Sequence, residues 1–143
     1  MKKYFLEISL IVFVSLLFRI FLLSLDLYKT VFFDEAVPGL MALEMLKGNF
    51  SFFYWGAPYL GSLEAIIAAL LFKILSVSTL VLRLSPLLFF VFFCIVTTYS
   101  AKQLSKNSFP WYALIFLFFP PFDLSSSAIL PFAGYMHILA IGS

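Results

Sequence analysis

The feature that most constrains the fold is a long, predominantly apolar stretch close to the amino terminus. It runs from Tyr4 to Leu25. A stretch of about 20 apolar residues is enough to cross about 30 Å of hydrocarbon as a helix. It is longer than the apolar part of a signal peptide, and no small-x-small cleavage motif follows it. We therefore expect an uncleaved transmembrane helix at about 4–25.

The composition extends this expectation to the whole chain. Of the 143 residues, 64% are hydrophobic and 11% are charged, whereas a soluble domain is typically about 45–50% apolar and about 25% charged. The sequence therefore predicts an all-α, polytopic integral membrane protein whose surroundings are membrane lipids. The net charge of +2 comes without a basic cluster, so no nucleic-acid partner is expected. Cys94 is the only cysteine, so an intramolecular disulfide is excluded.

Two further apolar segments have the composition of membrane spans. We expect them at about 83–102 and 109–122, and the start of a fourth span from about 134. Pro120-Pro121 must break or kink the third of these helices, because proline lacks the amide that a helix needs. Since the last apolar run has barely begun, the chain is interpreted as the amino-terminal part of a longer protein.

The positive charges predict how the chain crosses the membrane. Lys2 and Lys3 precede the first span, so the positive-inside rule places the amino terminus in the cytoplasm of a plasma (inner) membrane. If segment 61–75 also crossed, Lys102 and Lys106 would lie outside, against the rule. We therefore expect this segment to lie along the outer surface.

The long loop at 26–82 should then be on the non-cytoplasmic face. Its helical patterns at about 35–47 and 61–75 suit the membrane surface better than the membrane interior. The aromatic segment 50–55 between them has two interpretations. It is either an interfacial belt of aromatic side chains or a lining for a lipid-linked substrate.

Two adjacent carboxylates, Asp34 and Glu35, follow the first span and should emerge at this outer face. Asp34 occupies a position where a carboxylate favours helix initiation, so capping is one explanation for it. Capping does not explain why two acids are adjacent, and a general base is the other explanation. Asp123 follows Pro120-Pro121 and should share this side of the membrane, either as a second acidic group of the site or as a loop residue.

Several short motifs together resemble one enzyme family. In chain order they are Arg19, Phe33-Asp34-Glu35-Ala36, Gly39-Leu40-Met41-Ala42, Gly48, Tyr54-Trp55-Gly56-Ala57-Pro58-Tyr59-Leu60-Gly61-Ser62-Leu63-Glu64-Ala65 and Leu82-Arg83-Leu84-Ser85-Pro86. This order resembles the polyprenyl-phosphate-sugar glycosyltransferases of the C-type superfamily. These are bacterial relatives of the protein O-mannosyltransferases and of the lipid A aminoarabinose transferase. The resemblance covers nearly the whole chain but only the amino-terminal part of such an enzyme.

The resemblance implies an inverting transfer of a sugar from a polyprenyl-phosphate carrier to a hydroxyl of a lipid, glycan or protein acceptor. The transfer would take place on the non-cytoplasmic side. Asp34 corresponds to the expected general base and Glu35 to its supporting partner. No cofactor and no metal ion are expected, because no cluster of His, Cys or carboxylate residues has the spacing of metal ligands.

The substrate-binding candidates are mostly charged residues. The leaving phosphate needs cationic or amide partners, and Arg83 is the first candidate, followed by Lys47 and Arg19. For each cation, anchoring at the membrane edge is the alternative, and Arg19 in particular is expected to snorkel to the outer headgroups. The remaining candidates are Asp123, Tyr59 and Glu64.

The chain departs from the family pattern at two places. Ala57-Pro58 stands where several relatives carry Lys-Pro to hold the donor phosphate, and His137 stands where close relatives carry a glutamate. A lone histidine at a helix start is more often structural. Two other functions stay open: a transporter or permease fragment, which would carry ionisable residues at mid-membrane, and a catalytically inactive truncated membrane protein.

Overall fold

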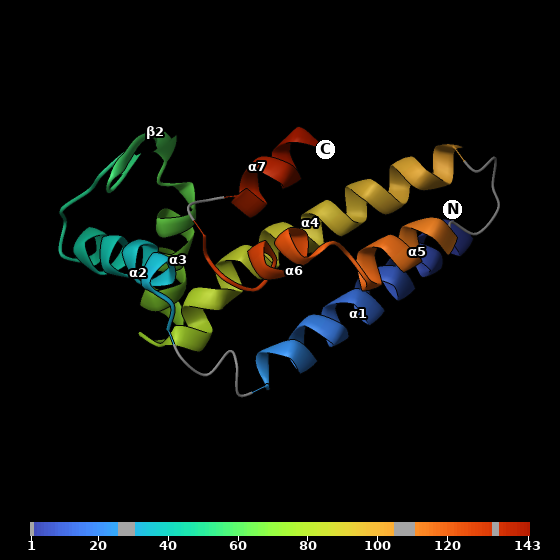
Figure 1. Cartoon of the computed structure of the whole chain (residues 1–143), viewed down its shortest axis with the longest axis horizontal. Coiled ribbons are helices and arrows are strands. Elements are labelled where there is room, and N and C mark those ends of the chain that lie inside the picture. The colour runs from blue at the N-terminus through green and yellow to red at the C-terminus, as the bar shows by residue number, and fades with distance from the viewer. Residues whose placement is uncertain (1, 26–30, 105–110, 133–134) are drawn as a thin grey trace.

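The computed structural model describes residues 2–25, 31–104, 111–132 and 135–143. Within them it contains helices and one small hairpin (Figure 1). The helices are α1 (Lys2–Leu23), α2 (Phe33–Leu46), α3 (Leu63–Ile74), α4 (Thr79–Leu104), α5 (Trp111–Phe118), α6 (Phe122–Ser127) and α7 (Tyr135–Gly142), and the strands are β1 (Phe53–Tyr54) and β2 (Ala57–Gly61).

Two helices are long and apolar enough to cross a membrane. They are the 19-residue part of α1 at Phe5–Leu23 and the 26-residue α4, which correspond to the expected spans at 4–25 and 83–102. The expected third span at 109–122 is not one continuous helix. Among its described residues, α5 ends at Phe118, before Pro120-Pro121, and the six-residue α6 follows. The double proline breaks the helix because neither residue offers an amide to the preceding turn.

The two long helices pack antiparallel along a single seam. The seam residues recur every four positions, so they share one face of each helix. All are buried: Glu7, Ile11, Ser15 and Arg19 on α1, and Phe90, Cys94, Thr98 and Lys102 on α4. At one end of the seam, Lys102 donates a hydrogen bond to the carboxylate of Glu7. At the other end, the guanidinium of Arg19 lies 4.8 Å from the ring centroid of Phe90.

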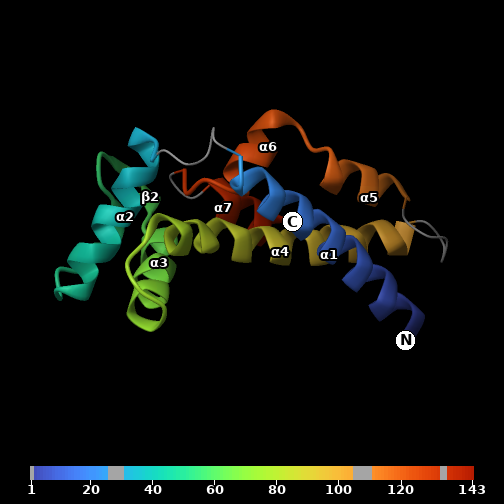
Figure 2. The same ribbon diagram turned by 90° about the horizontal axis from the view of Figure 1, so that it is seen from below.

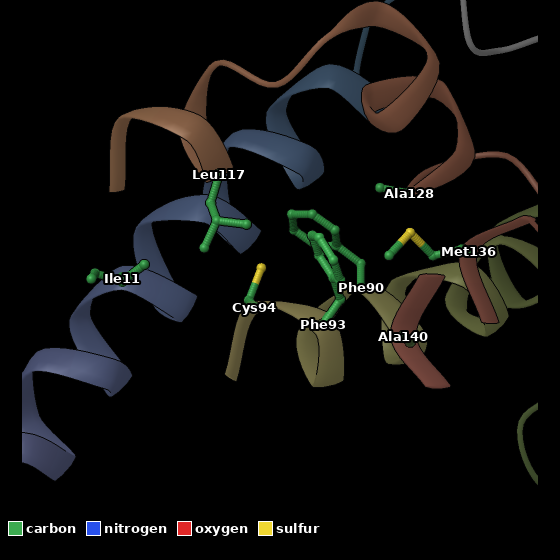
Figure 3. Packing of buried hydrophobic residues seen from close by; sticks show 8 residues of the cluster. All are labelled: Ile11, Phe90, Phe93, Cys94, Leu117, Ala128, Met136 and Ala140. Carbon is green, nitrogen blue, oxygen red and sulfur yellow. The ribbon is translucent and has the colours of Figure 1, made fainter. Parts of the chain in front are cut away.

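The apolar core continues from this seam to the carboxyl-terminal helices. Leu117 of α5 and Met136 and Ala140 of α7 pack with Phe90 and Cys94 of α4. Figure 3 shows these side chains in one cluster with Ile11, Phe93 and Ala128. α4 contributes Phe90, Phe93 and Cys94 to this cluster, and α1, α5 and α7 pack against it.

A second, smaller unit lies where α4 begins. There α2 and α3 run across the direction of α4, as Figure 2 shows, and small residues allow close packing between them: Ala42 of α2 against Ala68 and Ala69 of α3. A Cβ at Gly39 would approach the side chain of Leu82 to 3.0 Å, so α2 also lies directly against α4. The helices expected at 35–47 and 61–75 are therefore present.

The described chain is mostly helical, as expected, and the small hairpin is an element that the sequence did not predict. β1 pairs antiparallel with β2, and Tyr54 lies opposite Ala57 across the two-residue turn Trp55-Gly56. Gly56 has a φ of +80°, which glycine adopts without the steric cost that a side chain would add. A strand of two residues is too short to produce the alternating pattern by which strands are recognised in sequence.

The buried Glu7–Lys102 pair yields a stability prediction. Removing one partner of a buried ion pair typically costs about 3–5 kcal/mol, whereas replacing both by apolar residues is often neutral. We expect Glu7→Leu or Lys102→Leu alone to lower the thermal midpoint of unfolding and the double variant to restore it. The buried thiol of Cys94 reports unfolding when the protein is heated with a thiol-reactive fluorophore. Additive losses in the double variant would contradict the pairing.

Candidate functional site

An open cavity of about 1250 Å³ lies among the described residues. Its walls come from the start of α2, the hairpin turn, α6 and α7. Asp34 and Asp123 both line it, together with Trp55, Tyr54, Tyr135 and Ser126. The expectation that Asp123 shares a side with Asp34 fits this arrangement, because two carboxylates separated by most of the chain face the same space.

Asp34 and Glu35 point in different directions although they are adjacent. Successive residues of an α-helix are turned by about 100° around its axis, and both residues lie in the first turn of α2. Asp34 is exposed and lines the cavity, whereas Glu35 is completely buried. The helix geometry therefore gives the two carboxylates separate environments.

Glu35 is held by Arg83 of α4. The Nε atom of Arg83 donates to Oε1 of Glu35 at 2.5 Å and its Nη2 atom donates to Oε2 at 2.8 Å. The exposed fraction of the Arg83 side chain is only 2%. Glu35 Oε2 also accepts a hydrogen bond from the backbone amide of Phe32, at 3.3 Å, and so helps to begin α2. This two-bond arrangement is the strongest geometry available to an arginine and a carboxylate.

The hairpin forms a fixed wall of the cavity. Its Tyr54 hydroxyl donates to the backbone carbonyl of Asp34 at 3.3 Å, and the amide of Trp55 donates to the sulfur of Met41 in α2 at 3.4 Å. Tyr54 is itself buried against Met41 and Ala65. The turn is therefore attached to α2, so it contributes Trp55, Gly56 and Ala57 to the lining.

Three of the expected phosphate-binding or substrate-binding residues lie away from the cavity. Arg83 is in the protein interior with Glu35, so the expectation that it grips a phosphate does not fit its position. Lys47 is exposed beyond the end of α2 and pairs with Glu44 at 2.6 Å. Tyr59 on β2 is 84% exposed and is not among the lining residues.

Two further candidates are buried. Glu64, in the first turn of α3, has an exposed fraction of 2%, and its backbone carbonyl accepts a hydrogen bond from Ser85 of α4. Arg19 was expected to snorkel to the headgroups, and this prediction is wrong. It is fully buried, donates to the carbonyl of Leu117 at 3.2 Å and lies over the ring of Phe90. A guanidinium with a carbonyl and aromatic faces around it is stabilised inside the protein.

Asp123 reaches the cavity because the double proline ends α5 and allows a new helix to begin. It lies in the first turn of the six-residue α6, and its carbonyl accepts a hydrogen bond from the Ser126 hydroxyl at 3.1 Å. His137, the departure from the family pattern, is buried and packs against Phe89, with ring centroids 5.6 Å apart. It does not line the cavity.

Several lining residues were not among the site residues that the sequence predicted. Ser126, Ser127 and Tyr135 line the cavity beside Asp123. The Ser-rich segment after Pro121 was a visible signal, since polar residues next to a broken helix need a polar environment. Phe93 and Phe116 gave no such signal, because two phenylalanines within apolar helices are indistinguishable in sequence from core residues.

The cavity combines two carboxylates, hydroxyl groups and the faces of aromatic rings. Carboxylates and hydroxyls accept hydrogen bonds from a ligand rich in hydroxyl groups, and aromatic rings provide apolar faces for packing. Within the described part of the chain, no three His, Cys, Asp or Glu side chains are grouped so that they would hold a metal ion. Comparisons with protein-family models, with curated proteins and with solved structures give no significant match.

The exposure of the acidic positions yields a labelling prediction. We expect Asp34→Cys and Asp123→Cys to react rapidly with a small water-soluble maleimide, because both positions face the open cavity. The matched control on the same helix is Ala42→Cys, which is fully buried and should react slowly, as should the native Cys94. Equal rates at positions 34 and 42 would contradict the arrangement of α2.

Proposed function

We propose that this chain is part of a membrane glycosyltransferase that transfers a sugar from a polyprenyl-phosphate carrier to an acceptor hydroxyl, with inversion. Asp34 is the general base. The observation that carries the proposal is the placement of Asp34, exposed on a spacious cavity that is also lined by Asp123 and by residues with hydroxyl groups. The acceptor is a lipid, glycan or protein, and no cofactor takes part.

The chemistry requires a group of this kind at this place. An acceptor hydroxyl that attacks an anomeric carbon must lose its proton, and a positioned base contributes typically about 10² to 10⁴ in rate. Of the two adjacent acids, Asp34 is the one that an acceptor in the cavity reaches, since Glu35 is buried against Arg83. Glu35 therefore supports the base from the protein interior and does not accept the proton.

The cavity wall also limits where the donor phosphate binds. No Lys, Arg or His is among the described residues that line the cavity. A phosphate beside Asp34 and Asp123 alone would be repelled by both carboxylates. The cationic partners that stabilise the leaving phosphate must therefore lie outside the described lining, and the sugar with its acceptor is the part that we place in the cavity.

The membrane arrangement that we propose has the active site outside. α1 and α4 are the two spans and run in opposite directions, so the start of α1 and the end of α4 lie at the same end of the molecule. With the amino terminus in the cytoplasm of the inner membrane, α2, α3 and the hairpin lie on the non-cytoplasmic surface. We propose that the part of the chain that contains α5, α6 and α7 also enters the membrane, so that the protein is multi-pass.

The base assignment predicts the effect of a single neutral substitution. In the complete protein, Asp34→Asn should lower the rate of sugar transfer by about 10²-fold or more, because the amide does not accept a proton. The measurement is transfer of radiolabelled sugar from the polyprenyl-phosphate donor in isolated membranes. Glu44→Gln is the matched control, since Glu44 is an acid of the same helix that lies outside the cavity lining. Unchanged transfer in Asp34→Asn would remove Asp34 from the reaction.

The topology is tested separately from the chemistry. A phosphatase reporter that is active only outside the cytoplasm should be active when it is inserted in the turn at Gly56. The same reporter fused after Leu104 should be inactive, because α4 returns the chain to the side of the amino terminus. Activity after Leu104 would mean that α3, and not only α1 and α4, crosses the membrane.

A further inference from the structure

The first turn of α2 is held from two sides. Arg83 of α4 makes two hydrogen bonds to the side chain of Glu35, and Tyr54 of β1 donates to the carbonyl of Asp34. We infer that these contacts position the Asp34 carboxylate toward the cavity and that Arg83, through Glu35, is the principal positioning residue. The inference rests on the proposed function for its effect on catalysis, but not for its effect on geometry.

A buried two-bond contact restrains more than a distance. The fork of the guanidinium fixes the plane of the carboxylate as well as its location, and no water competes, since the Arg83 and Glu35 side chains are 2% and 0% exposed. Glu35 also accepts from the amide of Phe32, so the same carboxylate fixes the start of the helix. Because adjacent helical residues keep a constant angular offset, fixing Glu35 fixes the direction in which Asp34 leaves the helix.

This restraint has a consequence for the proposed reaction. A displacement of about 1 Å in a catalytic group can cost about 10²-fold in rate. Arg83 does not line the cavity, so its loss should disturb the position of the base at the start of α2 while leaving the walls contributed by α6 and α7 in place. Substitution of Arg83 should therefore lower kcat much more than it raises KM.

The geometric test uses cross-linking across the cavity. In the full chain carrying Asp34→Cys and Asp123→Cys, bifunctional thiol reagents of graded length should give a cross-linking yield that peaks at one length. Adding Arg83→Met should broaden the profile and lower the peak yield several-fold. Lys47→Met is the matched control, because it breaks an exposed ion pair at the end of α2 and should leave the profile unchanged.

Positioning is separated from folding by the native thiol and a conservative variant. Cys94 is fully buried in the core, so its reaction with a reagent reports a loss of fold. If Arg83→Met unfolds, Arg83→Lys decides, since it keeps the buried charge and loses the fork. A broadened profile with an unreactive Cys94 supports the inference. An unchanged profile in folded protein, or unfolding of Arg83→Lys as well, overturns it.

Activity measurements distinguish the positioning role of Arg83 from the proposed function. In protein with Asp34 intact, Arg83→Met or its folded substitute Arg83→Lys should lower kcat, by up to about 10²-fold, with little change in KM. Full transfer in Asp34→Asn would defeat the proposed function while the cross-linking result still decides the positioning role. Loss of transfer in Asp34→Asn together with a normal kcat in Arg83→Lys would defeat the positioning role alone.

Discussion

The seam between α1 and α4 determines where everything else in the chain lies. Charged groups occur at both ends of this contact, with Glu7 against Lys102 at one end and Arg19 over Phe90 at the other. A shift of one helix by a turn would leave buried charges without these contacts, and an uncompensated buried charge costs several kcal/mol. Charge therefore fixes the register, which apolar contacts alone would leave less strictly defined.

The middle and the start of α4 contact different elements. Its middle residues Phe90 and Cys94 pack with α1, α5 and α7, whereas Arg83 near its start holds α2 through Glu35. The cavity lies between the elements attached to these two regions, the start of α2 on one side and α6 and α7 on the other. The opening between Asp34 and Asp123 is thus set by a single long helix, which is a rigid way to hold two distant segments apart.

The sequence predicted those features that depend on neighbouring residues. The helices at α1, α2, α3 and α4 follow from apolar runs and turn signals, and the break after Phe118 follows from two prolines. The environments of Arg19 and Arg83 were not predictable in this way. Arg19 bonds to a carbonyl 98 positions away and Arg83 to a carboxylate 48 positions away, and nothing local distinguishes a buried arginine from one that anchors a helix at the membrane edge.

The adjacent acids illustrate the same limit at the centre of the site. Asp34 and Glu35 are adjacent and chemically alike, and the burial of Glu35 against Arg83 gives them different environments. An exposed carboxylate next to a buried, paired one is chemically different from two carboxylates that share a proton. The buried acid fixes the backbone, and the exposed acid remains available to a substrate. The roles of two adjacent acids at the start of a helix therefore depend on whether an arginine far away in the sequence forms an ion pair with one of them.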